Sequence, residues 1–198
     1  MDSKVLKLKN NQSRKSYLTE LYGLPAVGKT TTLNKHPEWN NVNDYLSKKF
    51  IVRQIIKLQL VCISFLTEPK QSLKMIFFAM KYAQNRKIAL AANLVSELPL
   101  LRTNVYNSVS DQGIWQALWS IAATGVKDDG FVDEATNILN NIMLPNAVMY
   151  LSDDIDSIVI RDINRYGKPG WYYADQIAVF NSKNATKIID QLLEKYYE

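Results

Sequence analysis

The chain has 198 residues, of which 47% are hydrophobic and 22% are charged, a balance typical of globular proteins and unlike that of disordered or fibrous chains. It contains one cysteine and one histidine, which excludes a disulfide within the chain and argues against a structural zinc site. Lys57, Glu97 and Asp111 interrupt the longest apolar stretches, so none reaches the roughly 18–20 apolar residues of a membrane span. We therefore expect a cytoplasmic protein without a membrane span.

The net charge of +5 is concentrated at the N-terminus. Residues 1–15 contain five basic residues and one acidic residue, a net charge of +4, which leaves +1 for residues 16–198. A nearly neutral body argues against a nucleic-acid-binding face, and the polar N-terminus lacks the apolar segment of a secretory signal. We predict that residues 1–15 form a flexible basic arm and that residues 16–198 form a single domain.

A β-prone stretch over 16–22 leads into a segment that matches GxxxxGK[ST], the phosphate-binding loop, and the next residues can continue as a helix. In this strand, loop and helix context, backbone amides and the helix N-terminus point at one anion. Lys29 would reach the β and γ phosphates, and the Thr30 hydroxyl would bind Mg²⁺. The alternative is an ordinary glycine-containing turn. The residues predicted to bind nucleotide are Gly23, Leu24, Pro25, Ala26, Val27, Gly28, Lys29, Thr30 and Thr31.

Proline at position 37 ends the first helix, and a polar loop follows. Apolar residues then recur at helical spacing in three segments, 46–67, 69–82 and 88–98, with Pro99 ending the last. We predict a helical insertion over about 46–98 with Cys62 as a buried free thiol. The stripes expected to face the core are Ile51, Ile55, Leu58 and Cys62 on the first helix and Leu73, Ile76, Phe77 and Met80 on the second.

Two further strands are predicted, over 104–110 and over the continuous apolar run 147–151. Helical patterns follow the first of them over 113–124 and 131–142. Alternating strands and helices indicate an α/β fold with a parallel sheet covered by helices on both faces. Ligands of such sheets bind at the carboxyl ends of the strands, where the loop and Asp111 both lie.

Asp111 has two interpretations. A carboxylate that ends a strand beside a triphosphate can hold Mg²⁺, directly or through water. Alternatively, Asp111 is the N-cap of the helix that begins near Gly113. The metal-binding role is our preferred prediction, and the two roles are compatible.

The last third of the chain begins with Ser152, which we predict to be the N-cap of a helix that extends to about Arg165. Arg161 and Arg165 are four residues apart, so on a helix they face the same way and can converge on phosphate. We predict a lid over about 161–172, in which Lys168 would add a further charge. The alternative is a solvated helix end that carries cations. A final helix is expected over 173–196.

No residue stands out as the base that would activate an acceptor. Glu38 next to Trp39 is the nearest local candidate, but no convincing strand precedes it, so we expect a surface loop residue. Asp44 is no better supported. His36 precedes a proline and is interpreted as a helix-end residue rather than as a catalyst.

The loop over 23–30, the Asp111-Gln112-Gly113 segment after a strand, and Arg161 with Arg165 after a late buried strand resemble the P-loop nucleoside and nucleotide kinase superfamily. The thymidylate-kinase-like and deoxynucleoside-kinase-like branches are the most similar. This resemblance covers about residues 17–196 and implies a P-loop NTPase (kinase-like) architecture with an arginine-bearing lid.

The chain departs from the pattern of this superfamily at two places. Ala26 and Val27 occupy positions where many small kinases have a third glycine, which makes the backbone less permissive to positive φ. Gln112 stands where these kinases often have arginine directly after the acidic residue, so the resemblance does not imply an acceptor-binding role for this position.

We expect an ATP-dependent phosphotransferase that uses Mg²⁺ and transfers the γ-phosphoryl group to a small-molecule acceptor such as a nucleoside or nucleotide. Lys29, Asp111, Arg161 and Arg165 would be the catalytic residues, with Thr30 and Asp111 at the metal. The alternatives are a nucleotide-binding regulatory module and a degenerate kinase fold that serves as an interaction domain. The identity of the acceptor, a preference for ATP over GTP and homo-oligomerisation are left open.

Overall fold

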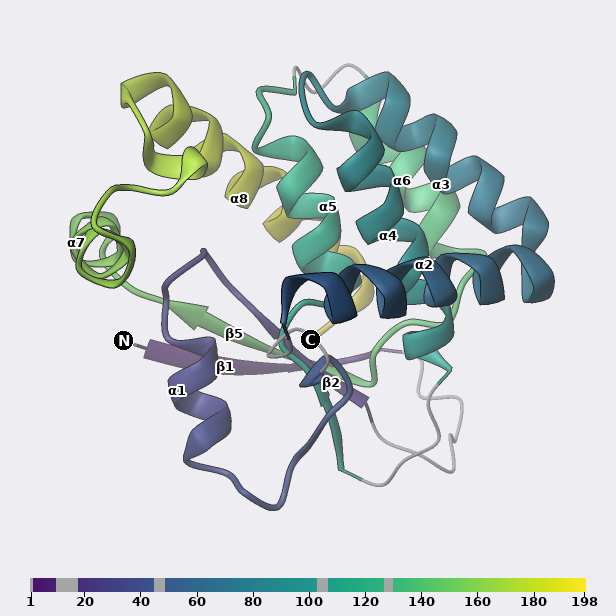
Figure 1. Cartoon of the computed structure of the whole chain (residues 1–198), viewed down its shortest axis with the longest axis horizontal. Helices are drawn as coiled ribbons and strands as arrows, with labels where there is room; N and C mark the ends of the chain where they lie inside the picture. Colours follow the sequence, from purple (N-terminus) through teal and green to yellow (C-terminus); the bar gives the residue numbers. More distant parts are fainter. Residues whose placement is uncertain (1, 10–17, 45–48, 103–106, 127–129) are drawn as a thin grey trace.

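The computed structural model describes residues 2–9, 18–44, 49–102, 107–126 and 130–198. Within these residues the protein is an α/β fold with a five-stranded, mostly parallel sheet and eight α-helices (Figure 1). The strand order is β1-β5-β2-β4-β3, with the loop strand β2 in the centre, parallel to both of its neighbours. The strands are β1 (Asp2–Lys7), β2 (Leu18–Tyr22), β3 (Asn40–Asn41), β4 (Ser108–Ser110) and β5 (Ala147–Ser152).

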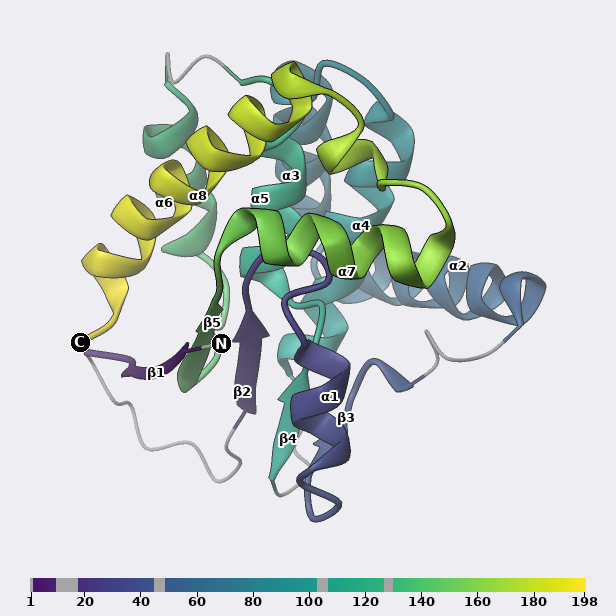
Figure 2. The same cartoon turned by 90° about the vertical axis from the view of Figure 1, so that its left-hand side faces the viewer.

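Helices lie on both sides of the sheet in unequal numbers. Five of them, α3–α6 and α8, form a thick layer on one side, whereas α1 lies on the other and α7 lies beyond the carboxyl end of β5 (Figures 1 and 2). The helices are α1 (Lys29–Asn34), α2 (Phe50–Thr67), α3 (Pro69–Tyr82), α4 (Lys87–Leu101), α5 (Ile114–Ala122), α6 (Phe131–Leu139), α7 (Ile155–Tyr166) and α8 (Gln176–Tyr196), with a short 3₁₀ helix over Trp171–Tyr173.

Asp2–Lys7 forms a strand of the sheet, so the prediction of a flexible arm over 1–15 is wrong for these residues. This strand also makes the sheet mixed rather than purely parallel. Asp2–Lys7 pairs antiparallel with Ala147–Ser152, and the amide of Lys7 donates to the carbonyl of Glu198 over 2.8 Å. An edge strand tolerates charged side chains because its flanks face water, which is why its sequence reads as a polar tail. Residues 10–15 of the predicted arm lie outside the described residues.

Two predicted helix boundaries are wrong for local reasons. Helix α4 continues through Pro99 to Leu101, because proline so near a helix end removes only one late hydrogen bond. Helix α7 is capped by Asp154 rather than by Ser152, which is the last residue of β5. The Asp154 carboxylate accepts hydrogen bonds from the amides of Asp156 and Ser157, both over 3.1 Å.

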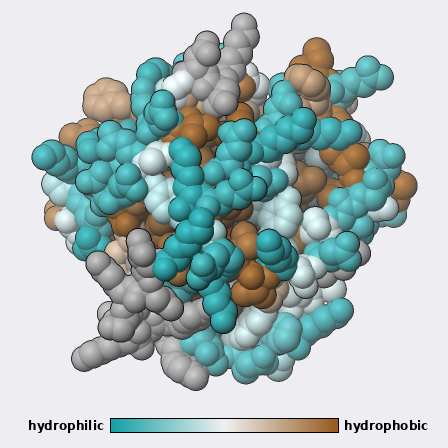
Figure 3. All heavy atoms as spheres, turned by 180° about the vertical axis from the view of Figure 1, so that it is seen from behind, coloured by the Kyte–Doolittle hydropathy of each residue, from teal (hydrophilic) through white to brown (hydrophobic). Residues whose placement is uncertain are grey.

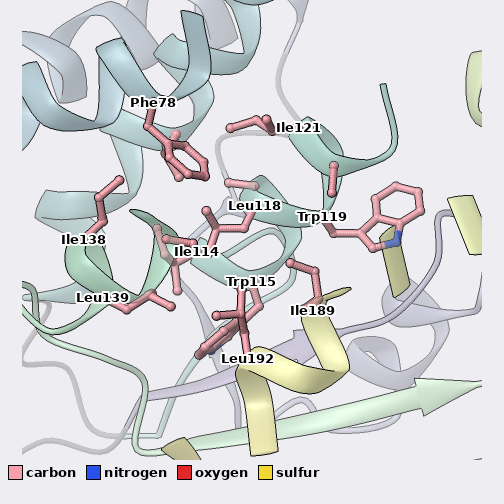
Figure 4. Close-up of a cluster of buried hydrophobic side chains, with 14 of the residues drawn as sticks. Phe78, Ile114, Trp115, Leu118, Trp119, Ile121, Ile138, Leu139, Ile189 and Leu192 are labelled. Atoms are coloured by element: carbon pink, nitrogen blue, oxygen red, sulfur yellow. The ribbon is translucent and has the colours of Figure 1, made fainter. Parts of the chain in front are cut away.

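The hydrophobic core is built around α5, all nine residues of which are buried. Trp115, Leu118 and Trp119 of α5 lie between Phe78 of α3, the side chains of α6, and Ile189 of α8 (Figure 4). The Trp119 indole donates to the hydroxyl of Thr186 over 3.1 Å. A helix enclosed in this way has a fixed position, and its N-terminus meets the sheet beside the loop that follows β2.

The predicted helices α2 and α3 exist, but the faces expected in the core point outward. Ile51, Ile55, Leu58 and Cys62 are all exposed on α2. On α3 the residues Leu73, Phe77 and Met80 are exposed, and Ile76 is partly buried. Periodicity identifies residues that share a face and does not identify which face turns inward. Helix α2 is also long and apolar enough to cross a membrane by length and composition alone, with a mean hydropathy of 1.6, contrary to the sequence expectation.

Replacing a leucine by alanine should lower the free energy of unfolding by different amounts on the buried and the exposed sides of the helical layer. Leu118 is 0% exposed and Leu58 is 64% exposed. We expect Leu118→Ala to lower the free energy of unfolding by about 2–5 kcal/mol, because it leaves a cavity around α5. Leu58→Ala should change it by less than about 0.5 kcal/mol. Urea denaturation followed by circular dichroism measures both values, and a large loss for Leu58→Ala would contradict the exposed position of this face.

Candidate functional site

The segment between β2 and α1 is a compact turn, so the predicted succession of strand, loop and helix is confirmed. The amide of Val27 donates to the carbonyl of Leu24 over 3.1 Å, and Gly28 adopts a left-handed conformation at the N-cap of α1. Gly23 is required sterically, because a Cβ there would lie 2.4 Å from the carbonyl oxygen of Leu151. Ala26 has φ 64°, a conformation that costs an alanine roughly 1–2 kcal/mol.

Side chains from the last third of the chain hold the loop. Tyr173 donates its hydroxyl to the carbonyl of Pro25 over 3.0 Å, and Arg161 donates from Nε to the carbonyl of Ala26 over 3.2 Å. Arg161 also donates to the Asp153 carboxylate over 2.9 Å, while Val27 is buried in a small apolar cluster. The predicted lid residue Arg161 therefore does meet the loop.

Lys29, the lysine of the loop motif, turns its ammonium group back toward the loop. Its Nζ donates to the carbonyl of Gly23 over 2.7 Å and to Oε1 of Gln116 over 2.9 Å. Burial lowers the pKa of Lys29 to about 8, and the neighbouring carboxyl groups of Asp111 and Glu20 oppose this shift. An additional anion at this position, such as a phosphate, would stabilise the charged form.

Glu20 in the middle of β2 is a functional candidate that the sequence analysis missed. Its side chain is fully buried, and its Oε1 accepts a hydrogen bond from the amide of Gln116 over 3.0 Å at the start of α5. Burial raises the pKa of Glu20 to about 8, although the α5 amides and Lys29 lower it. Its Oε2 is buried and has no hydrogen-bond partner among the described residues. An acidic residue inside an otherwise buried strand next to the loop was the available signal.

The start of helix α5 excludes one of the two interpretations of Asp111. The N-cap of α5 is Gly113, and the first-turn amide of Gln116 donates to Glu20 rather than to Asp111, so the N-cap interpretation of Asp111 is wrong. A Cβ at Gly113 would lie 2.3 Å from Oε2 of Glu20, which explains why a glycine begins this helix. The carboxyl group of Glu20 occupies the place at the helix N-terminus where an acidic residue is stabilised.

Asp111 follows β4 directly and lines a cleft together with Thr30. Burial raises the pKa of Asp111, while Lys29 and a hydrogen bond from the Asn41 side chain oppose the shift. Its Oδ1 is buried and has no hydrogen-bond partner among the described residues. A free carboxylate oxygen and a nearby hydroxyl fit Mg²⁺, which is commonly held by one or two carboxylates together with phosphate oxygens. Groups of three acidic, histidine or cysteine side chains that could hold a metal are absent from the described ranges.

The cleft beside the loop has a volume of about 1000 Å³. Its charged lining is mainly basic, with Asp44 and Asp111 as the only acidic members among the described residues that line it. Cations and aromatic rings that line a cleft are suited to bind an anionic molecule with a planar or apolar part. The basic lining residues are Arg53, Lys57, Arg86 and Arg165, and the aromatic ones are Trp39, Phe50 and Tyr166, with His36 beside them.

The remaining predicted residues fall into two groups. Arg165 lines the cleft, whereas Lys168 is exposed in the loop after α7. Glu38 is exposed as expected and accepts a hydrogen bond from His36 over 3.0 Å. Asp44 lies nearer to the candidate site than the sequence indicated. It follows the short strand β3, lines the cleft, and its negative charge raises the pKa of Asp111. Two asparagines have low β propensity, so β3 was not predictable from the sequence.

A second pocket of about 400 Å³ touches the opposite end of the loop. Gly23 and Leu24 line it from the loop, and Tyr150, Phe180 and Lys187 line it from β5 and α8. The loop therefore separates two cavities of different character: the larger is rich in charge and the smaller is largely apolar.

Comparisons with protein-family models, with curated proteins and with solved structures found no match for this chain.

Ala26 allows a test of the loop conformation. Because glycine adopts positive φ without steric cost, we expect Ala26→Gly to raise the free energy of unfolding by about 0.5–1 kcal/mol, net of the entropy of the glycine. Ala89→Gly in the exposed part of α4 is the matched control and should lower it by about 1 kcal/mol. Thermal and urea unfolding measure both changes. Loss of stability in both variants would show that residue 26 does not have positive φ.

The buried carboxyl group of Glu20 predicts a pH dependence of stability. The unfolded chain releases this proton near pH 4.5, whereas the folded chain keeps it up to about pH 8. The contribution of Glu20 to stability is therefore fully present below about pH 4.5 and is lost as the pH rises toward 8, with a slope of about 1.4 kcal/mol per pH unit for one proton. Glu20→Gln keeps the acceptor oxygen and should remove this contribution.

The matched control for this experiment is Glu38→Gln, since Glu38 is exposed and its pKa is lowered rather than raised. A slope will remain in Glu20→Gln because burial also raises the pKa of Glu97. Urea unfolding at a series of pH values measures the slopes. Equal slopes for Glu20→Gln and the unsubstituted protein would mean that Glu20 is ionised in the folded state.

Proposed function

We propose that this protein is a P-loop kinase that binds ATP with Mg²⁺ and transfers the γ-phosphoryl group to a small-molecule acceptor. The observation that supports this most is the loop over 23–30, which turns between the central strand β2 and helix α1 with Lys29 inside it and Asp111 beside it. Central placement of the loop strand between β4 and β5 is also in keeping with a P-loop NTPase architecture.

Each predicted catalytic residue has a role that its position supports. Lys29 would bind the β and γ phosphates, after exchanging its contacts with the Gly23 carbonyl and Gln116 for phosphate oxygens. Thr30 and Asp111 would hold Mg²⁺, which neutralises charge on the transferring phosphoryl group. Arg165, which lines the cleft, and Arg161, after exchanging its contacts with the Ala26 carbonyl and Asp153 for phosphate oxygens, would stabilise the charge that develops during transfer.

The two cavities on either side of the loop can take the two parts of the reaction. The largely apolar pocket beside Gly23 and Phe180 suits a nucleotide base. The basic cleft would hold the acceptor, with its hydroxyl or phosphate directed toward Asp111. Asp44 and Asp111 are the carboxylates in reach of such an acceptor, and either could accept its proton.

The proposal is tested by ADP release from ATP and Mg²⁺ in the presence of nucleosides, nucleotides and sugars. We expect one acceptor to raise the rate well above background. Lys29→Ala should lower kcat/KM by about a hundredfold or more, because it removes a preorganised charge from the transition state. Asp111→Asn should lower activity while leaving metal-free nucleotide binding in place, and the exposed Glu38→Gln is the control that should change neither.

Two other outcomes would replace the proposal. A protein that binds nucleotide tightly but ignores every acceptor is a nucleotide-binding regulatory module. Absence of Mg²⁺-dependent ATP binding in calorimetry would indicate a degenerate kinase fold, for which the alanine at position 26 is the local cause to examine first.

A further inference from the structure

The near-neutral total charge of residues 16–198 conceals a local excess of basic residues in the helical insertion, balanced by acidic residues elsewhere in the chain. Residues 49–102 contain nine lysine and arginine residues and two acidic residues, a net charge of +7, which leaves −2 for the rest of the chain. Of the two acidic side chains, Glu97 is buried and Glu68 is paired with Arg102 over 2.8 Å. Of the nine basic side chains, Arg53, Lys57 and Arg86 line the cleft and Lys81 is paired with Glu134. The basic side chains that can accompany an outward apolar face include Lys70 and Lys74 of α3.

The same segment exposes several large apolar side chains that do not pack in the core. Leu66 is 84% exposed, and Phe77 is 71% exposed. Ile51, Ile55 and Leu58 follow one another at i, i+4 and i+7, so they share one side of α2. Apolar side chains that share a surface mark an interaction site more often than singly scattered ones do. We define the α2–α3 face by its exposed residues Ile51, Ile55, Leu58, Ile63 and Leu66 on α2 and Leu73, Phe77 and Met80 on α3.

Lysines accompany this apolar surface. Lys70 is three residues before Leu73 and Lys74 is three residues before Phe77 on α3, so each lysine lies next to an exposed apolar side chain on the helix. Figure 3 shows the side of the molecule seen from behind in Figure 1, away from α2, where hydrophilic residues are interspersed with hydrophobic ones. Apolar side chains beside lysines are the composition of helices that lie in a membrane interface.

The inner side of α2 is tied to the fold, which determines how it can meet a membrane. Ser64 donates its hydroxyl to the carbonyl of Val95 over 2.8 Å, and Lys57 donates to Asn93 over 2.6 Å. The helix extends along the outside of the neighbouring helices (Figure 2). A span would require these polar groups to enter hydrocarbon without partners, so α2 is suited to lie on a bilayer rather than to cross it.

We propose that the α2–α3 face binds the surface of an anionic lipid bilayer. Anionic headgroups complement Lys70 and Lys74 beside the exposed apolar residues of α3, and the exposed side chains of α2 and α3 can enter the boundary between headgroups and acyl chains. A second copy of the chain is disfavoured as the occupant, because a symmetric contact would bring the lysines of two such faces together. This inference is independent of the proposed kinase activity.

The test is cosedimentation of the full chain with vesicles of phosphatidylcholine alone and with vesicles that also contain phosphatidylserine. We expect binding to the anionic vesicles that is at least about tenfold stronger than to the neutral ones and that weakens with added salt. Replacing Lys70 and Lys74 by glutamine should weaken binding about fivefold for each charge removed.

The apolar contribution is tested with a triple variant, Leu58→Gln, Leu66→Gln and Phe77→Gln, which should lower binding by about tenfold or more. These side chains are exposed and lie outside the lining of the nucleotide pocket and the cleft, so the fold should be retained, as circular dichroism will show. The matched control is Ile160→Gln with Ile177→Gln on α7 and α8, which are 58% and 71% exposed and should leave binding unchanged.

Three outcomes would overturn the inference. They are equal binding to neutral and anionic vesicles, unchanged binding of the triple variant, and absence of binding to either vesicle. If the chain binds neither vesicle, sedimentation velocity will show whether it self-associates. Self-association that the triple variant abolishes would make a second copy of the chain the occupant of this face.

Discussion

The candidate site depends on a chain of hydrogen bonds that connects the central strand, the buried helix and the loop. The amide of Gln116 donates to the carboxyl group of Glu20 on β2, and the side-chain oxygen of Gln116 accepts from the ammonium group of Lys29. Gln116 lies on a helix with no exposed residue, so it has little freedom to move. The packing of α5 therefore determines where the lysine of the loop can lie.

This arrangement places titratable groups of opposite sign in a poorly hydrated region. Burial raises the pKa values of Glu20, Glu97 and Asp111 and lowers that of Lys29. Perturbed groups of this kind gather at functional sites because binding or reaction can exchange their partners. A bound phosphate would stabilise the charge of Lys29, and a bound cation would stabilise the charge of Asp111, so the proposed ligands act on groups whose charged forms burial disfavours.

The outer helices have a different physical role from the inner ones. Helix α5 is buried all round and organises the core, whereas α2 turns an apolar face to its surroundings and makes polar contacts on its inner side. A helix with this reversed arrangement adds little to the core through its outer residues. Its composition is accounted for if a membrane surface covers it, and the cleft lined by the inner side of α2 would remain separate from that contact.

Local sequence patterns were sufficient to predict the features that depend only on residues close together in the chain. The spacing of Gly23, Gly28 and Lys29 predicted the turn between a strand and a helix, and helical periodicity located α2 and α3, because both rest on local backbone chemistry. Only the tertiary structure decided which face of α2 turns inward, that Asp2–Lys7 joins the sheet, and that Glu20 meets the start of α5. These features depend on contacts between residues that are distant in sequence. Glu20 and Gln116, for example, are 96 residues apart, and no local pattern contains information about such a partner.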